Sequence, residues 1–88
     1  MVSLKKICSS SLNLKIISFF HQHPATVDTA AGYAAWLNQD RDKVAKALDF
    51  LANQKVLVVH RTRATLAYGF TQNKAMIKRI EKLLEDKT

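Results

Sequence analysis

Apolar residues recur every three or four positions along much of the chain, which is the spacing of one buried helix face. The pattern predicts four helices, at residues 11–23, 29–37, 40–53 and 71–86. Pro24 ends the first of them, because a proline ring disfavours helical geometry at the preceding residue. Asp28 or Thr29 can cap the second helix, since a side-chain oxygen there accepts from an orphan backbone N–H. Asp40 and Thr71 are predicted to cap the last two helices in the same way.

The periodicity changes to that of β-strands after residue 55. Val56-Leu57-Val58-Val59-His60 is a β-branched run suited to a strand, and Leu66-Ala67-Tyr68-Gly69-Phe70 is a second such run. The polar link at 61–65 is short enough for the two runs to pair as a hairpin. The predicted order is therefore helix, helix, helix, strand, strand, helix.

The helix predicted at 11–23 carries apolar residues on two faces. One stripe consists of Leu12, Ile16, Phe19 and Phe20. Leu14 and Ile17 fall on the opposite side. A helix that is apolar on two faces must bury both, either in its own domain or against a second subunit. We therefore expect a homodimer, with Leu14, Ile17 and the C-terminal helix at its interface.

Two short helices joined by a tight turn and followed by a β-hairpin resemble a winged helix-turn-helix domain. The residues that carry the resemblance are Tyr33-Ala34-Ala35-Trp36-Leu37-Asn38, then Val44, Leu48 and Leu51, and finally Tyr68-Gly69-Phe70-Thr71. Ala34 matches the small residue that lets the two helices cross closely. Asn38 stands where the family usually has a turn glycine, and Lys55 where it often has a glycine that ends the recognition helix.

The resemblance covers residues 12–86 and implies an α+β fold that is mainly α: three helices, a β-hairpin wing and a C-terminal helix. It implies a single winged-helix domain over residues 1–88, with 1–10 as an N-terminal extension. Similar domains occur in small bacterial and archaeal repressors, often homodimers, including the arsenic-repressor-like and multiple-antibiotic-resistance-like groups. The chain is thus expected to be a sequence-specific DNA-binding transcriptional regulator.

In this family the third helix lies in the major groove of double-stranded DNA, and the wing touches the backbone or minor groove. The resemblance therefore assigns the groove to helix 40–53 and the wing to the hairpin 56–70. The helix candidates are Gln39, Arg41, Asp42, Lys43, Lys46 and Asp49, and the wing candidates are His60, Arg61, Thr62 and Arg63. Arginines at a hairpin tip suit phosphates or a narrow minor groove.

The charge of the chain favours a polyanionic partner but does not decide where that partner binds. The 88 residues include 14 Lys and Arg against 7 Asp and Glu, a formal net charge of +7. Residues 40–63 contain six cations and three anions, which is +3 of the net +7. The rest of the surplus lies outside this segment, so the positive charge is spread along the chain. The outward face of helix 40–53 includes Asp42, Lys46 and Asp49 and is net acidic, which opposes the phosphates beside a groove.

Other function classes lack their motifs in this sequence. Without a phosphate-binding glycine-rich loop, nucleophile elbow or paired-carboxylate motif, we expect no enzyme, and we expect no cofactor. The possible metal ligands Cys8, His21, His23 and His60 lack ligand spacing, so no metal site is expected. The single cysteine, and the lack of a signal-peptide core or a run of about 18 apolar residues, lead us to expect a cytoplasmic protein that does not span a membrane.

The residues leave two alternatives open. The first is a winged-helix protein-protein interaction module that does not bind DNA, in which an exposed Phe50 and the acidic face of helix 40–53 contact a protein. If Phe50 is not exposed, it packs beneath the wing or against the first helix. The second alternative is a metal- or redox-responsive repressor that uses His21, His23 or Cys8. Binding to random DNA near physiological salt separates the first alternative from a regulator.

Overall fold

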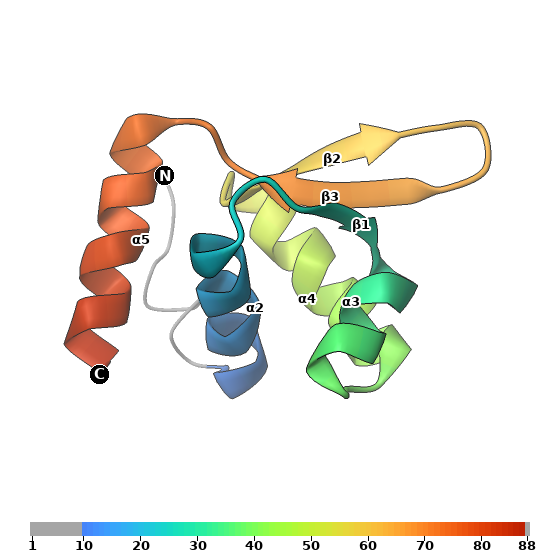
Figure 1. Ribbon diagram of the computed structural model, residues 1–88, viewed down its shortest axis with the longest axis horizontal. Helices are drawn as coiled ribbons and strands as arrows, with labels where there is room; N and C mark the ends of the chain where they lie inside the picture. The colour runs from blue at the N-terminus through green and yellow to red at the C-terminus, as the bar shows by residue number, and fades with distance from the viewer. Residues whose placement is uncertain (1–9, 88) are drawn as a thin grey trace.

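The computed structural model describes residues 10–87, in which four helices and three strands form one small α+β unit (Figure 1). The helices are α2 (Ser11–Gln22), α3 (Ala30–Leu37), α4 (Arg41–Asn53) and α5 (Lys74–Lys87). The strands are β1 (Val27–Thr29), β2 (Leu57–Arg61) and β3 (Leu66–Phe70). None of the helices within residues 10–87 has the length and apolar content needed to cross a membrane.

The three strands form an antiparallel sheet in the order β1–β3–β2. The predicted hairpin is confirmed: β2 pairs with β3 from Leu57 opposite Phe70 to Arg61 opposite Leu66. Strand β1 adds to the other edge of β3 and was missed, because the sequence indicates a loop at residues 25–28. A strand of three residues is too short to show an alternating pattern. It forms because β3 offers a free row of hydrogen-bonding groups beside it.

The hydrophobic core lies between the sheet and helices α2, α3 and α4, and Ile80 of α5 is buried in it as well (Figure 1). The apolar stripe predicted for α4 is buried in it and consists of Val44, Ala47, Leu48 and Leu51. Aromatic rings join three elements at its centre. The centroid of the Phe20 ring lies 4.9 Å from that of Tyr33 and 6.0 Å from that of Phe70. The Phe20 side chain of α2 therefore packs against both α3 and β3.

Ile17 belongs to this core and has no exposed surface within the single chain. The expectation that Ile17 contacts a second subunit is therefore wrong, because none of its side chain is left for a partner. Ile17 lies next to the buried Ile16 and one helical turn from the buried Phe20. The buried side of α2 is therefore one wide face that includes Ile17, rather than two separate apolar faces. Leu14 is half-buried, and so are the apolar residues Met76, Ile77, Leu83 and Leu84 of α5.

Polar side chains set the start of each helix. Ser10, Thr29 and Asp40 each accept a hydrogen bond from a backbone N–H in the first turn of α2, α3 and α4. At α5 this role falls to Asn73, whose Oδ1 accepts from a first-turn N–H at 3.0 Å. Thr71, which the sequence indicates as the cap, instead accepts from the Asn73 N–H at 3.1 Å. The helix therefore starts later than predicted, because the chain must first turn away from β3.

Candidate nucleic-acid interface

Helix α4 presents the predicted groove residues in its first two turns. Because its apolar stripe faces the core, the residues between the stripe positions face solvent. The exposed candidates are Arg41, Asp42, Lys43, Lys46 and Asp49. Gln39 is half-buried in the turn before the helix, where Asp40 accepts from the Lys43 N–H at 3.1 Å. The structure thus exposes all the helix candidates except Gln39.

Two residues in the left-handed conformation fix where α3 and α4 end. Asn38, with a φ of 53°, turns the chain between the two helices as the sequence predicts. Lys55 has a φ of 67° just after α4 and leads the chain into β2. A lysine in this conformation costs about 1–2 kcal/mol, a cost that glycine avoids. Packing of the apolar stripe before it, and of Val56 and Leu57 after it, holds this turn in place.

One wing candidate, Arg61, lies in a different element from the one that the sequence indicates. His60 and Arg61 are the last two residues of β2, and only residues 62–65 form the loop. Thr62 and Thr65 close that loop: the Thr62 N–H donates to the Thr65 carbonyl at 2.9 Å, and the Thr62 hydroxyl accepts from the Thr65 N–H at 3.1 Å. The Thr62 hydroxyl is therefore used within the loop, and Arg63 is the cation at its tip.

His60 and Arg61 project from opposite faces of the sheet, because successive side chains alternate along a strand. Arg61 shares a face with Tyr68, which turns toward α4. His60 lies over Gly69 on the other face, where its Nε2 is 3.3 Å from the position that a Cβ on that glycine would occupy. The structure therefore brings Arg61 to the side of α4 and leaves His60 away from it.

A hydrogen-bonded chain joins the hairpin to the helices. The Tyr68 hydroxyl donates to Oδ1 of Asp49 at 2.6 Å, which links β3 to α4. The backbone carbonyl of Tyr68 accepts from the buried Tyr33 hydroxyl at 2.6 Å, which links β3 to α3. Asp49, a candidate for groove contact, is therefore engaged within the protein. These two hydrogen bonds help to orient the hairpin relative to the helices, together with the packing of Leu57, Tyr68 and Phe70 in the core.

The two tyrosines of this chain are held in their neutral form. Burial raises the pKa of Tyr33 and that of Tyr68 to about 12. For Tyr68, the hydrogen bond to Asp49 and the negative charge of that carboxylate raise the pKa too, whereas the positive charge of Arg61 lowers it. Arg61 is thus close enough to act on Tyr68. Its charge opposes that of Asp49 where the hairpin meets α4.

We expect the protein to lose stability between about pH 10 and pH 12. Tyrosines of the unfolded chain ionise near the ordinary pKa of 10.0, whereas Tyr33 and Tyr68 in the folded chain keep their protons to about 12. Between about pH 10 and pH 12 the unfolded state therefore binds fewer protons than the folded state. The free energy of unfolding therefore falls, by at most about 1.4 kcal/mol per pH unit for each tyrosine.

Urea unfolding at a series of pH values measures this fall. The double variant with Tyr33→Phe and Tyr68→Phe should be less stable at neutral pH, because it loses both hydrogen bonds, but its stability should decline less steeply above pH 10. An alkaline decline as steep as that of the unmodified protein would contradict the assignment to these two hydroxyls.

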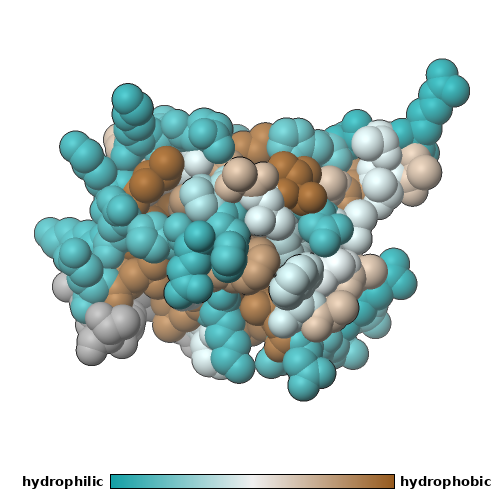
Figure 2. Space-filling view, in the orientation of Figure 1, coloured by the Kyte–Doolittle hydropathy of each residue, from teal (hydrophilic) through white to brown (hydrophobic). Residues whose placement is uncertain are grey.

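Five exposed cations on α4 and the hairpin form no ion pair with any carboxylate of residues 10–85. They are Arg41, Lys43, Lys46, Arg61 and Arg63. The ion pair that this part of the chain does contain is elsewhere, between His21 Nε2 of α2 and Glu81 of α5 at 3.1 Å. Hydrophilic side chains project from the loop end of the hairpin in Figure 2. All five cations are therefore open to an external polyanion.

The histidines lie apart in the structure. His21 pairs with Glu81, the His23 ring lies 5.0 Å from that of Phe19, and His60 lies over the sheet. In the part of the chain that the structure describes, no three His, Cys, Asp or Glu side chains gather as ligands for a metal ion. Cys8, the remaining candidate for a metal or redox role, lies outside the described residues.

The exposed aromatic residue is Trp36 rather than Phe50. Phe50 is half-buried and packs against the core, so it does not offer a free aromatic surface. Trp36, in α3, is 72% exposed, with its ring centroid 6.2 Å from that of Phe19. This exposure could not be predicted from the periodicity, because Trp36 follows the buried Tyr33 by three positions, the spacing of one helix face.

Sequence reasoning missed the contact between Asp49 and Tyr68, because the two residues are 19 positions apart and in different elements. A tyrosine in a strand and an aspartate on a helix carry no local signal that they will meet. The structure thus brings Arg61 and α4 together and engages Asp49 and Thr62 internally.

No protein-family model, curated protein or solved structure matches this chain.

Proposed function

We propose that the chain is a winged-helix DNA-binding protein that acts as a sequence-specific transcriptional regulator. The observation that carries the proposal is the set of five exposed, unpaired cations on α4 and the β2–β3 hairpin. The Tyr68–Asp49 hydrogen bond holds these two elements together. An α-helix fits the major groove of double-stranded DNA, and cations beside it bind the flanking phosphates. Helix α4 therefore enters the groove while the hairpin serves as the wing.

The candidate residues divide between phosphate contact and base contact. Lys43 and Lys46 on α4, with Arg61 and Arg63 on the hairpin, neutralise phosphates and supply most of the affinity. Arg41, at the start of α4, and Gln39 before it are proposed to contact base edges, where Arg pairs with guanine and Gln with adenine. Asp42 can accept from the N4 amino group of cytosine while lowering affinity for every other sequence. This division predicts a regulator that discriminates well but binds random DNA modestly.

The regulator is proposed to act as a homodimer. Leu14 and the half-buried Ile77, Leu83 and Leu84 of α5 form the interface, and Ile17 takes no part in it because it is buried in the core. A two-fold dimer places its two groove helices on half-sites related by the same symmetry. The preferred operator is therefore expected to be a palindrome.

Fluorescence anisotropy of the full chain with a labelled random duplex, titrated across salt, tests the proposal. If four or five cations release counterions, log Kobs should fall linearly with log salt at a slope of about −4. Operator selection should then recover a palindrome that binds roughly 1,000-fold or more tightly than the random duplex. An anisotropy that stays flat at about 50 mM salt would overturn the proposal, since electrostatic attraction is strong there.

One observation favours a second candidate function, a protein-interaction module. Trp36 is 72% exposed, and tryptophan is enriched among the residues that dominate protein interfaces. In this function the face of α3 binds a protein, and the chain does not bind DNA. The same titration separates the two functions, because only the regulator gives a salt-dependent change in anisotropy with random duplex DNA.

A further inference from the structure

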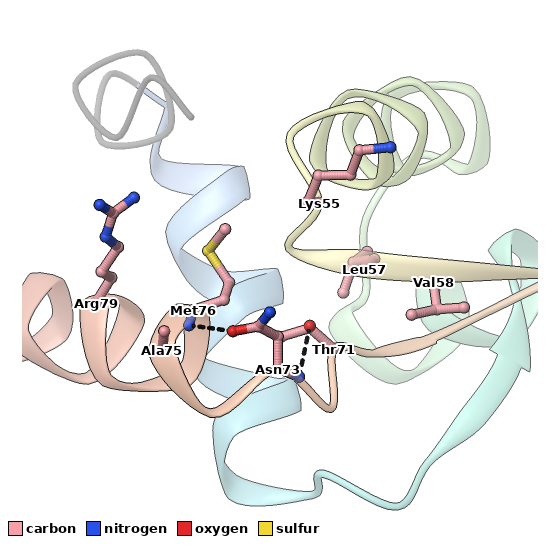
Figure 3. Close-up of a pocket in the computed structure, with 8 residues that line it drawn as sticks. All are labelled: Lys55, Leu57, Val58, Thr71, Asn73, Ala75, Met76 and Arg79. Carbon is pink, nitrogen blue, oxygen red and sulfur yellow. Dashed lines mark hydrogen bonds between the residues drawn. The ribbon is translucent and has the colours of Figure 1, made fainter. Parts of the chain in front are cut away.

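A cavity of about 570 Å³ lies at the base of the hairpin, between the start of α5 and the segment that joins α4 to β2. Figure 3 shows Met76 and Arg79 of α5 on one side, Lys55 and Leu57 on the other, and Asn73 between them. Its volume falls within the range of roughly 300–1,000 Å³ found for small-molecule sites. Of the residues proposed to contact DNA, none lines the cavity.

Part of the cavity wall is apolar. Leu57 is only 4% exposed, Met76 is half-buried, and Val58 remains 43% exposed. Val58 lies on the face of the sheet that turns away from α4, opposite Gly69, so no helix covers it. Val58 and Met76 supply most of the accessible part of this wall, since Leu57 is almost wholly buried, and a small apolar group laid against the wall would be removed from water.

The polar groups around the cavity are hydrogen-bond donors. Thr71 Oγ1 already accepts from the Asn73 N–H, and Asn73 Oδ1 from the Met76 N–H, so part of the acceptor capacity of both oxygens is used within the protein (Figure 3). The Asn73 side-chain amide N–H groups, the Lys55 ammonium and the Arg79 guanidinium are left to donate. Neither cation pairs with a carboxylate of residues 10–85, and none of the described residues that line the cavity is acidic.

We propose that this cavity binds a small organic anion with an apolar body and one carboxylate. The apolar body lies on Leu57, Val58 and Met76, and the carboxylate is bound by Arg79 and Lys55. A guanidinium suits a carboxylate because two parallel N–H groups match its two oxygens. Lys55 is exposed and has a flexible stem, so its ammonium can approach the carboxylate from the other side. This binding activity goes beyond DNA binding and does not depend on it.

Titration of the isotope-labelled full chain, followed by backbone amide NMR shifts, tests the site with three probes. Benzoate should give saturable shifts centred on Leu57, Val58, Asn73 and Met76. Benzylammonium has a similar size but the opposite charge, and inorganic phosphate has the charge without the apolar body, so neither should saturate the same amides. Equal shifts with benzylammonium would overturn the charge selectivity, and equal shifts with phosphate would overturn the role of the apolar wall.

Matched variants locate the anion. The double variant Lys55→Gln with Arg79→Gln should raise the Kd for benzoate about tenfold or more, because it removes both charged donors. The control double variant Lys78→Gln with Lys82→Gln removes the same charge from exposed positions of α5 outside the cavity. It should leave the Kd within about twofold. Equal losses in the two double variants would show a general charge effect and overturn the site.

A third variant keeps both cations and changes the shape of the cavity. Ala75 is exposed on α5 and lines the cavity, so Ala75→Phe should fill part of it without disturbing the core. Benzoate binding should then be lost while the dispersion of the other amide signals is retained. Benzoate affinity equal to that of the unmodified chain would show that the anion binds elsewhere.

Discussion

Replacing both hairpin arginines, Arg61→Ala with Arg63→Ala, is expected to weaken binding to every DNA sequence by roughly 10- to 100-fold near 0.1 M salt. Arg61 lies on the α4 side of the sheet, and Arg63 lies at the loop tip. Neither has a carboxylate partner within residues 10–85, so both are available to bind phosphates. The slope of log Kobs against log salt should become shallower by about 2, one unit for each lost contact.

Anisotropy titrations of the double variant against selected and random duplexes measure both quantities. The ratio of the two affinities should stay nearly constant, since phosphate contacts carry no base information. His60→Ala is the internal control within the hairpin, because His60 lies on the opposite face of the sheet and should be dispensable. Lys78→Ala with Lys82→Ala controls for the loss of two positive charges. Unchanged affinity in the arginine double variant would remove the wing from the mechanism.

Phe20→Ala is expected to cause the largest loss of stability, about 3–5 kcal/mol. Phe20 has no exposed surface, and its ring contacts those of Tyr33 and Phe70. Removing it leaves a void where α2, α3 and β3 meet, and partners in a close-packed core relax into such a void only in part. Domains of this kind are stable by about 5–15 kcal/mol, so the loss takes a large share of the total. Urea unfolding at neutral pH measures it.

Trp36→Ala is the matched control for Phe20→Ala. It also replaces a large aromatic residue with alanine, but Trp36 is 72% exposed, so little buried contact is lost. We expect a change of less than about 1 kcal/mol in the free energy of unfolding. If the two variants were equally destabilised, the packing of the core around Phe20 rather than Trp36 would be wrong.

The helices and two of their caps, Thr29 and Asp40, could be predicted from the sequence because the forces that form them act over a few residues. The stripe of Val44, Leu48 and Leu51 predicts α4, and Asp40 caps it as expected. Asn38 adopts the left-handed turn that its side chain tolerates. The hairpin is also local, since its two strands are joined by only four residues. Periodicity, capping and turn formation all depend on residues that are close together in the sequence.

The remaining features depend on contacts between distant parts of the chain. Strand β1 exists because β3 lies beside it, and Ile17 is buried because several elements meet around α2. Side chains alternate along a strand, so His60 and Arg61 lie on opposite faces of the sheet. Only the tertiary structure shows which of the two faces meets α4. The exposed Asp49 accepts a hydrogen bond from Tyr68 because the hairpin lies next to α4 in the folded chain.

The sequence by itself therefore determined the positions of the four helices, the hairpin and the positive charge of the chain. Only the tertiary structure decided which of the charged residues share a face, which are engaged within the protein and where the anion cavity lies. The physical reason is one of range. Helix and turn formation is governed by residues within a few positions of each other, whereas a surface is assembled from elements that become neighbours only when the core is packed.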